Sequence, residues 1–402
     1  MGIIIPLVLV LISSLIIWRA SDAFETASDY LGRNLSDGVK GATINAIASS
    51  MPELFTSMFF LFVLRDVDGF SGGIGTTAGS AIFNSMIIPS MAILAVIYSG
   101  VTNKIKVSRK VLNRDGYTLI GTEIIFILMI SGTSLDWYHG MALMLIYVVY
   151  LVYMLSTMTK VDEKMGHEEY AEKMNRNNDE GEEGAKKKSI IKSAATIDLE
   201  HLVVGKKDLK GNTAWPLLII STVVIALSCY FLVLACEWLG SDTYYVPFLG
   251  EFHGLDIPIM FVALILAAAA SSIPDTIISM KDSRKGNYDD AISNAMGSNM
   301  FDICFALGFP LFLFTIIYGP INMTQDVIDL SGELRMTLLI LTVITFIIFI
   351  SGKYMGKIKA FMLIGLYILF TLFIVGRSNE NPISMAIAKL MRDIVDIMVF
   401  WA

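Results

Sequence analysis

The chain has 402 residues, of which 55% are hydrophobic and 17% are charged, and its formal net charge is −7. Several runs without any charged residue are long enough to cross a bilayer, so the composition excludes an ordinary soluble domain and predicts a polytopic membrane protein. The chain has only three cysteines, which excludes a disulfide framework, and their spacing excludes a zinc site. The first apolar run lacks a basic start and a cleavage site, so we interpret it as a retained helix.

Apolar runs predict an all-α membrane protein with ten transmembrane helices. Their expected ranges are 3–18, 38–64, 72–100, 116–132, 138–158, 215–239, 256–280, 287–318, 335–351 and 357–376. Lysine and arginine residues fall mostly in the connections that follow odd-numbered helices, which by the positive-inside rule places both termini outside the cell. We expect an integral protein of the plasma (inner) membrane.

Four regions follow from this pattern. They are a first transmembrane half at 1–158, a charged cytoplasmic loop at 159–214, a second transmembrane half at 215–376 and an amphipathic C-terminal segment at 377–402. The apolar and charged residues of the last segment separate at helical spacing, which predicts a helix lying at the membrane interface.

Two short motifs occur in both halves of the chain. Residues 48–53, Ala-Ser-Ser-Met-Pro-Glu, recur as residues 270–275, Ala-Ser-Ser-Ile-Pro-Asp. Residues 79–84, Gly-Ser-Ala-Ile-Phe-Asn, recur as residues 297–302, Gly-Ser-Asn-Met-Phe-Asp. Because five predicted helices separate equivalent positions and five is odd, the halves should be inverted repeats. Transporters with inverted repeats bind their substrate near the bilayer midplane, where the repeats meet.

Each copy of the first motif places one carboxylate inside an otherwise uncharged run. Glu53 is the only charged residue from 41 to 64, and Asp275 is the only one from 257 to 280. An ionised side chain at such a depth costs at least about 2.5 kcal/mol and is usually functional. We find no basic residue deep in any predicted helix, so a buried ion pair does not explain either carboxylate.

Further oxygen atoms accompany these carboxylates. Pro52 and Pro274 cannot donate hydrogen bonds to the carbonyl groups of Ala48 and Ala270, which leaves these two oxygens free where a helix breaks. An all-oxygen set suits Ca²⁺, Na⁺ or K⁺ rather than zinc or copper. The side chains that share a helix face are Ser49 and Ser50 with Glu53, Ser271 and Ser272 with Asp275, Ser80 with Asn84, and Ser298 with Asp302.

At these motifs the sequence resembles the cation/calcium exchanger superfamily, and most closely its potassium-dependent sodium/calcium exchanger branch. Residues 52–57 and 79–84 resemble the first alpha repeat of that branch, and residues 272–275, 284–286 and 297–302 resemble the second. The sequence departs from the usual pattern in having alanine in place of the leading glycine of each first motif. It also carries Lys281 and Asp282 where apolar residues are expected.

The resemblance implies a role for each matched position. Glu53 and Asp275 would be the central carboxylates shared by Ca²⁺ and Na⁺, flanked by Asn84 and Asp302. Hydroxyl ligands would come from Ser49, Ser50, Ser80, Ser271, Ser272 and Ser298, and backbone carbonyl ligands from Ala46 and Ala268. Because three ionised carboxylates exceed the charge of one Ca²⁺, either K⁺ binds as well or Asp302 is protonated.

The expected function is secondary active exchange of Na⁺ for Ca²⁺, with or without K⁺, by alternating access at one shared site. A Ca²⁺/H⁺ exchanger using the same carboxylates is the nearest alternative. A cation channel and an intramembrane aspartyl protease fit less well, since channels are usually symmetric oligomers and the protease signatures are missing. We therefore expect a non-enzyme without a resident cofactor, whose partners are the lipid bilayer and inorganic cations and not nucleic acid. The oligomeric state is open.

Overall fold

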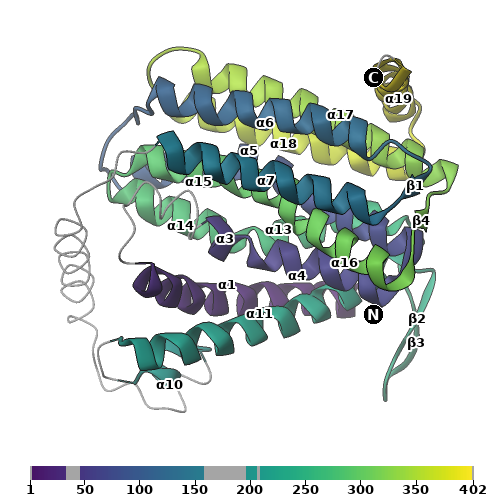
Figure 1. Cartoon of the computed structure of the whole chain (residues 1–402), viewed down its shortest axis with the longest axis horizontal. Coiled ribbons are helices and arrows are strands. Elements are labelled where there is room, and N and C mark those ends of the chain that lie inside the picture. The colour runs from purple at the N-terminus through teal and green to yellow at the C-terminus, as the bar shows by residue number, and fades with distance from the viewer. Residues whose placement is uncertain (1, 33–45, 158–195, 206–208, 401–402) are drawn as a thin grey trace.

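The computed structural model describes residues 2–32, 46–157, 196–205 and 209–400, and most of these lie in helices that run side by side along one direction (Figure 1). The elements in chain order are α1 (Ile4–Leu31), α3 (Ala46–Ser49), α4 (Met51–Phe59), η2 (Phe60–Leu64), α5 (Asp66–Tyr98), α6 (Arg109–Met129), β1 (Ser134–Leu135), α7 (Trp137–Thr157), α10 (Leu199–Val203), α11 (Gly211–Gly240), β2 (Thr243–Val246), β3 (Gly250–His253), α12 (Ile259–Val262), η3 (Ala263–Ala267), α13 (Ala268–Ser271), α14 (Ile273–Arg284), α15 (Tyr288–Phe301), η4 (Asp302–Ala306), α16 (Gly308–Tyr318), β4 (Ile321–Asn322), α17 (Gln325–Ile350), α18 (Lys357–Ser378) and α19 (Pro382–Phe400).

Seven helices of the described part are long and apolar enough to cross a membrane. The region Ile259–Arg284, in which two helices meet at 40°, would be an eighth span if it crosses as one unit, and Met51–Leu64 is a shorter apolar helix. The chain is therefore an integral membrane protein with a mostly helical fold, as the composition predicts. Residues 38–45 of the second expected helix and residues 159–195 and 206–208 of the expected loop lie outside the described residues.

Several helices extend beyond the apolar runs that predicted them. Helix α1 continues past residue 18 to Leu31, α6 begins at Arg109 instead of 116, and α17 begins at Gln325 instead of 335. These boundary predictions were wrong because apolar length measures the hydrocarbon core, whereas a helix with polar ends continues beyond that core.

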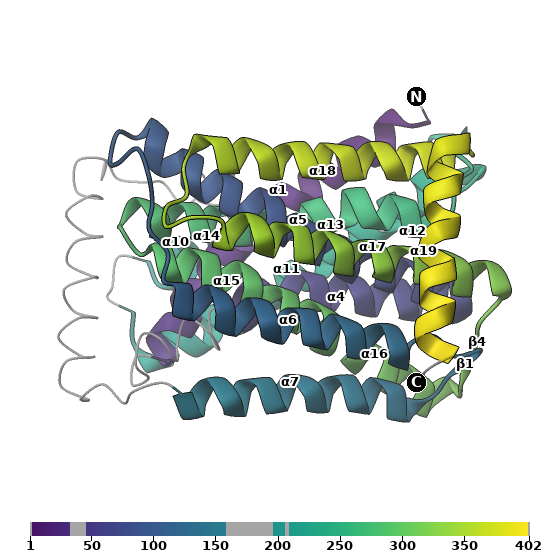
Figure 2. The same ribbon diagram turned by 90° about the horizontal axis from the view of Figure 1, so that it is seen from above.

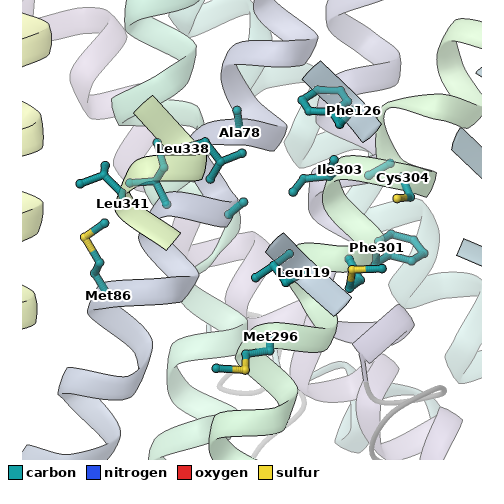
Figure 3. Close-up of a cluster of buried hydrophobic side chains, with 14 of the residues drawn as sticks. Ala78, Met86, Leu119, Phe126, Met296, Phe301, Ile303, Cys304, Leu338 and Leu341 are labelled. Atoms are coloured by element: carbon teal, nitrogen blue, oxygen red, sulfur yellow. The ribbon is translucent and has the colours of Figure 1, made fainter. Parts of the chain in front are cut away.

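Helices α1 and α11 form a pair along one edge of the bundle (Figure 1). Ile17 of α1 and Ile225 of α11 belong to a hydrophobic cluster that is separate from the main one. The main cluster joins α5, α6, α15 and α17, and Figure 3 shows part of it around Leu119. Lys281 of α14, one of the departures from the family pattern, reaches across to α1 and forms an ion pair with Asp22 at 2.9 Å.

The two small sheets, the N-terminus and helix α19 all lie at one end of the bundle (Figure 1). Strand β1 pairs with β4 and β2 with β3, in both cases antiparallel. Figure 2 shows α19 crossing the direction of α17 and α18. Arg392 anchors α19 to α17 through Asp329 at 3.1 Å and Glu333 at 3.2 Å. The expected helix in the C-terminal segment is confirmed, and its place at a membrane interface stays a prediction.

Two glycines allow α5 to lie against α12 and η3. A Cβ atom on Gly75 would come within 2.7 Å of the carbonyl oxygen of Met260. A Cβ atom on Gly79 would overlap the carbonyl oxygen of Leu264. Small residues permit such close approach of helix backbones in a membrane. The contact places Ser80, which follows Gly79, at the centre of the bundle.

Candidate cation-binding site

Two broken helices position the repeated carboxylates. The break between α3 and α4 falls at Ser50, and the break between α13 and α14 falls at Ser272. A proline then occupies the first turn of α4 and of α14, where its missing amide proton is not needed. Glu53 and Asp275 lie in these first turns, so each carboxylate has the positive end of a helix dipole behind it.

Three carboxylates, from α4, α14 and η4, converge inside the bundle, and Ser80 of α5 contacts two of them. Glu53, Asp275 and Asp302 have 0% exposed surface. The hydroxyl oxygen of Ser80 lies 2.8 Å from Asp302 Oδ2, 2.8 Å from Ser272 Oγ and 3.3 Å from Glu53 Oε1. Ser272 also donates to Glu53 Oε1 at 3.1 Å. Through Ser80, the structure therefore joins the second motif of the first half to both motifs of the second half.

Two amide groups and a further hydroxyl group donate hydrogen bonds to Asp302 and Asp275. Asn84 donates to Asp302 Oδ2 at 3.2 Å, which connects two positions that are equivalent in the repeat. Asp275 Oδ1 accepts hydrogen bonds from Ser298 at 3.2 Å and from Asn294 at 3.4 Å. Our sequence reasoning missed Asn294, although it precedes Ser298 by four residues and so shares its helix face.

Several buried oxygen atoms of this cluster have no hydrogen-bond partner in the described part of the chain. They are Glu53 Oε2, Asp275 Oδ2, Asp302 Oδ1, Asn84 Oδ1 and Ser50 Oγ. Carboxylate and amide oxygens can only accept, and an unsatisfied buried acceptor costs about 1–3 kcal/mol. A cation is the group that satisfies several such oxygens at once, and these oxygens are the ligand type that Ca²⁺ and Na⁺ prefer.

The described residues include no group of three or more His, Cys, Asp or Glu side chains that could hold a metal ion alone. Glu53 and Asp302 are joined through the hydroxyl group of Ser80, and Ser272 bonds to Glu53 as well. The oxygen atoms gathered here belong to hydroxyl and amide groups as well as to carboxylates. That mixed set fits a hard cation with a flexible coordination shell better than a structural transition metal.

The other predicted ligand positions lie beside this cluster. Ser49 is within hydrogen-bonding reach of Asp275 and Ser50 lies close to Asp302. Ser271 donates to the carbonyl oxygen of Ala268 at 3.2 Å, and the amide of Ser272 donates to the same oxygen at 3.1 Å. The Ala268 carbonyl is thus already used within its helix. The other predicted carbonyl ligand, Ala46, is the first residue of α3.

One expectation about basic residues was wrong. Arg335 is only 1% exposed and lies inside α17, deep in the bundle. Its guanidinium donates to the carbonyl oxygen of Ile127 at 2.8 Å and to Ser131 Oγ at 3.1 Å. The positive charge of the Arg335 guanidinium, placed beside the Ile127 carbonyl group, stabilises the C-terminal end of α6. Because Arg335 serves that helix end, it does not neutralise the three central carboxylates.

A family model described as "Sodium/calcium exchanger protein" matches residues 5–156 and 213–376. The chain is 28% identical over 344 residues to human (Homo sapiens) sodium/potassium/calcium exchanger 5, which covers 73% of this chain and 66% of that protein. It is 36% identical over 123 residues to mouse (Mus musculus) sodium/potassium/calcium exchanger 2, which covers 30% of this chain and 18% of that protein. The chain thus spans less than two thirds of the length of these relatives.

Two solved structures share the fold at low sequence identity. The structure of the H⁺/Ca²⁺ exchanger CAX superposes with a TM-score of 0.55 at 12% identity, covering 96% of this chain and 92% of that chain. The sodium-calcium exchanger NCX_Mj superposes with a TM-score of 0.52 at 19% identity, covering 91% of this chain and 98% of that chain. The helical arrangement is therefore common to exchangers named for different coupling ions.

Proposed function

Since the chain belongs to the sodium/calcium exchanger protein family, we propose that it is a secondary active antiporter that exchanges Na⁺ for Ca²⁺ by alternating access. One observation carries the proposal. The carboxylates of both repeated motifs meet at a fully buried cluster, and one oxygen of each carboxylate has no partner in the described part of the chain. Both ions would compete for these oxygens, and competition for one site produces exchange rather than co-transport.

The ligands in this proposal are the residues expected from the repeats. Glu53 and Asp275 supply the shared central charges, while Asp302 and Asn84 flank them. The serine hydroxyls complete the coordination shell, namely Ser49, Ser50, Ser80, Ser271, Ser272 and Ser298. The backbone oxygen of Ala46 is a further proposed ligand, and that of Ala268 would join only after local rearrangement, because it already accepts two hydrogen bonds.

Charge balance limits what this site can hold. Three ionised carboxylates carry a charge of −3, and one Ca²⁺ leaves −1 in a medium of low dielectric constant, which is unfavourable. Binding K⁺ together with Ca²⁺ removes that charge, and so does a proton on Asp302. Three Na⁺ ions would also neutralise the site. The site is therefore most stable when it is filled, which opposes leakage of one ion without the other.

The proposed architecture consists of ten transmembrane helices in two inverted five-helix repeats. In the described residues the order of elements is compatible with this arrangement, with α1 corresponding to α11 and α5 to α15 and α16. We propose that the pair α1–α11, which has its own hydrophobic cluster, moves against the other helices to change access. From the positive-inside distribution of Lys and Arg, we propose that both termini lie outside and that the 159–214 loop is cytoplasmic.

Radiolabelled Ca²⁺ uptake into proteoliposomes loaded with Na⁺ tests this function. We expect uptake that requires the outward Na⁺ gradient. A further requirement for external K⁺ would assign K⁺ as a co-transported ion, and indifference to K⁺ would assign a proton to Asp302. Uptake that follows a pH gradient and ignores Na⁺ would replace the proposal by Ca²⁺/H⁺ exchange. Uptake that ignores every gradient would contradict exchange altogether.

A further inference from the structure

The hairpin formed by β2 and β3 ends in an exposed apolar turn. The amide of Leu249 donates to the carbonyl oxygen of Val246 at 3.1 Å, and this hydrogen bond closes the turn. The side chain of Phe248 is fully exposed, and that of Leu249 is 66% exposed. Residues 243–250 include no charged side chain. Because large apolar side chains are unfavourable in water, we expect this turn to have an apolar partner.

The backbone conformation of Phe248 gives independent support for a partner. Its φ angle is 69°, in the left-handed region that is unfavourable for a bulky residue. Pro247 precedes it, and the two residues fit the central positions of a type II turn. Glycine or asparagine is the usual residue at the position of Phe248, since either adopts this conformation easily. The turn alone therefore does not explain an aromatic residue here, and a contact made by the ring would.

The hairpin is attached to the ends of α1 and α11. Trp238 of α11 stacks on Tyr244 of β2, with the ring centroids 5.2 Å apart and the planes at 12°. Tyr244 also donates a hydrogen bond to the carbonyl oxygen of Gly2, just before α1. Figure 1 shows the hairpin running across the direction of the helices, with its turn extending past α11. Since α1 and α11 are long and apolar enough to cross a membrane, the hairpin lies at the membrane surface, where tryptophan and tyrosine collect.

The two faces of the hairpin differ from its turn. Tyr244 and Phe252 lie on one face and stack on each other, with their ring centroids 5.9 Å apart. Tyr245, Glu251 and His253 are exposed on the other face. The strands thus have an aromatic face that packs within the protein and an exposed face with polar groups that suit water. The apolar surface without a partner in the hairpin is therefore concentrated at the turn.

We propose that this turn inserts Phe248 and Leu249 into the interfacial region of the lipid bilayer, so that the hairpin anchors the adjoining ends of α1 and α11 to the membrane surface. Lipid is already the expected neighbour of this edge of the bundle, because α11 exposes apolar side chains such as Leu227 and Phe231. Residues 239–255 include no lysine or arginine, so the contact depends on apolar insertion and not on attraction to anionic headgroups. The inference does not depend on which ions are exchanged.

A spin label at the turn measures its surroundings directly. Leu249→Cys is labelled in the full chain, which is then placed in phosphatidylcholine nanodiscs; the three native cysteines are buried. Oxygen, which partitions into lipid, and a water-soluble nickel chelate are compared as relaxing agents. Glu251→Cys is the matched control, because Glu251 is exposed on the same hairpin. We expect the label at position 249 to be reached by oxygen and shielded from the chelate, and the label at position 251 to be reached by the chelate. Equal access of the chelate to both labels overturns the proposal.

A second substitution separates the side chain of Phe248 from the shape of the turn. Phe248→Asn suits the left-handed conformation, so the hairpin should keep its fold while it loses the ring. Added to labelled Leu249→Cys, it should increase access of the chelate to the label, and unchanged access would contradict insertion of Phe248.

Two further outcomes test the nature of the partner. Adding phosphatidylglycerol to the nanodiscs should leave the result unchanged, and shielding that appears only with this anionic lipid would contradict an apolar contact. A label shielded from both agents and broadened by a second label would show that another copy of the chain covers the turn, which also overturns the proposal. If labelled Leu249→Cys does not fold, Phe248→Trp replaces it. Brominated phosphatidylcholine should then quench the added fluorescence, and no quenching overturns the proposal.

Discussion

Ser80 donates a hydrogen bond of 2.8 Å to Asp302, and this bond joins the two copies of the repeated motifs. The same hydroxyl oxygen lies 2.8 Å from Ser272 and 3.3 Å from Glu53. A hydroxyl group carries a single proton, so Ser80 can donate to only one of these oxygens at a time. The cluster therefore has more acceptors than donors, and a bound cation removes this imbalance.

Replacing Ser80 by alanine should weaken Ca²⁺ binding without unfolding the protein. The variant loses one ligand and leaves Asp302 Oδ2 with Asn84 as its remaining donor. A lost hydrogen bond to a charged group costs about 1.5–3 kcal/mol, so the half-saturating Ca²⁺ concentration should rise about tenfold to a hundredfold. Ser90→Ala is the matched control, because Ser90 lies on the same helix but bonds to backbone carbonyl groups. Equal affinities in the two variants would contradict the role of Ser80.

Neutralising either central carboxylate should abolish Ca²⁺ transport. Glu53→Gln and Asp275→Asn keep the shape of the side chain and remove one of the charges that hold the ion. Each variant should fold, because the change removes a buried charge that has no basic partner in the described residues. Thermal unfolding with and without Ca²⁺ measures whether each variant folds and whether it still binds the ion. Ca²⁺ should raise the Tm of the wild-type protein and have little effect in either variant. Normal exchange in either one would refute the site assignment.

Asp302→Asn tests the origin of any K⁺ dependence. With Asp302 neutral, the central site carries two negative charges, which one Ca²⁺ balances alone. The variant should therefore transport Ca²⁺ without stimulation by K⁺. The measurement is Na⁺-driven Ca²⁺ uptake as a function of external K⁺, with wild type in parallel. Stimulation by K⁺ that persists in the variant would show that K⁺ binds elsewhere.

The central cluster was predictable because its carboxylates stand out in the sequence. Glu53 and Asp275 are isolated charges in apolar runs, and their surroundings are repeated. That combination predicts both membrane burial and convergence at the interface of the two halves. The helix breaks at Ser50 and Ser272 were equally predictable from the prolines that follow.

Other polar residues gave no such signal. Asn294 is neither charged nor repeated, so only the packing of α15 against α14 places it beside Asp275. Arg335 lies near the start of an apolar run, where sequence alone suggests a solvated helix end. The structure extends α17 backward to Gln325 and thereby buries the guanidinium. Which single polar residues become buried depends on how far helices extend and which faces meet, and neither is encoded in local composition.

The contact between α5 and η3 leads to a prediction about helix spacing. Gly79→Ala would bring its Cβ atom onto the carbonyl oxygen of Leu264 and within 2.8 Å of the Ala268 side chain. Both are part of a packed helix that carries Ser272 and Asp275, so the helices must separate. Separation weakens the bonds that Ser80 makes across the cluster. We expect overpacking to lower the free energy of unfolding by about 1–3 kcal/mol, which is measured as a lower Tm. Ca²⁺ binding should also be weaker.

Gly121→Ala is the matched control for that substitution. Gly121 lies inside α6, and no atom of another described element lies within 4 Å of an added Cβ. Alanine is favoured over glycine in a helix by about 1 kcal/mol, so this variant should be as stable as wild type or more stable. Opposite effects of the two substitutions on Tm would show that Gly79→Ala loses stability because of the contact between α5 and η3. If Gly79→Ala is as stable as the control and binds Ca²⁺ normally, close approach of α5 to η3 is not what positions Ser80.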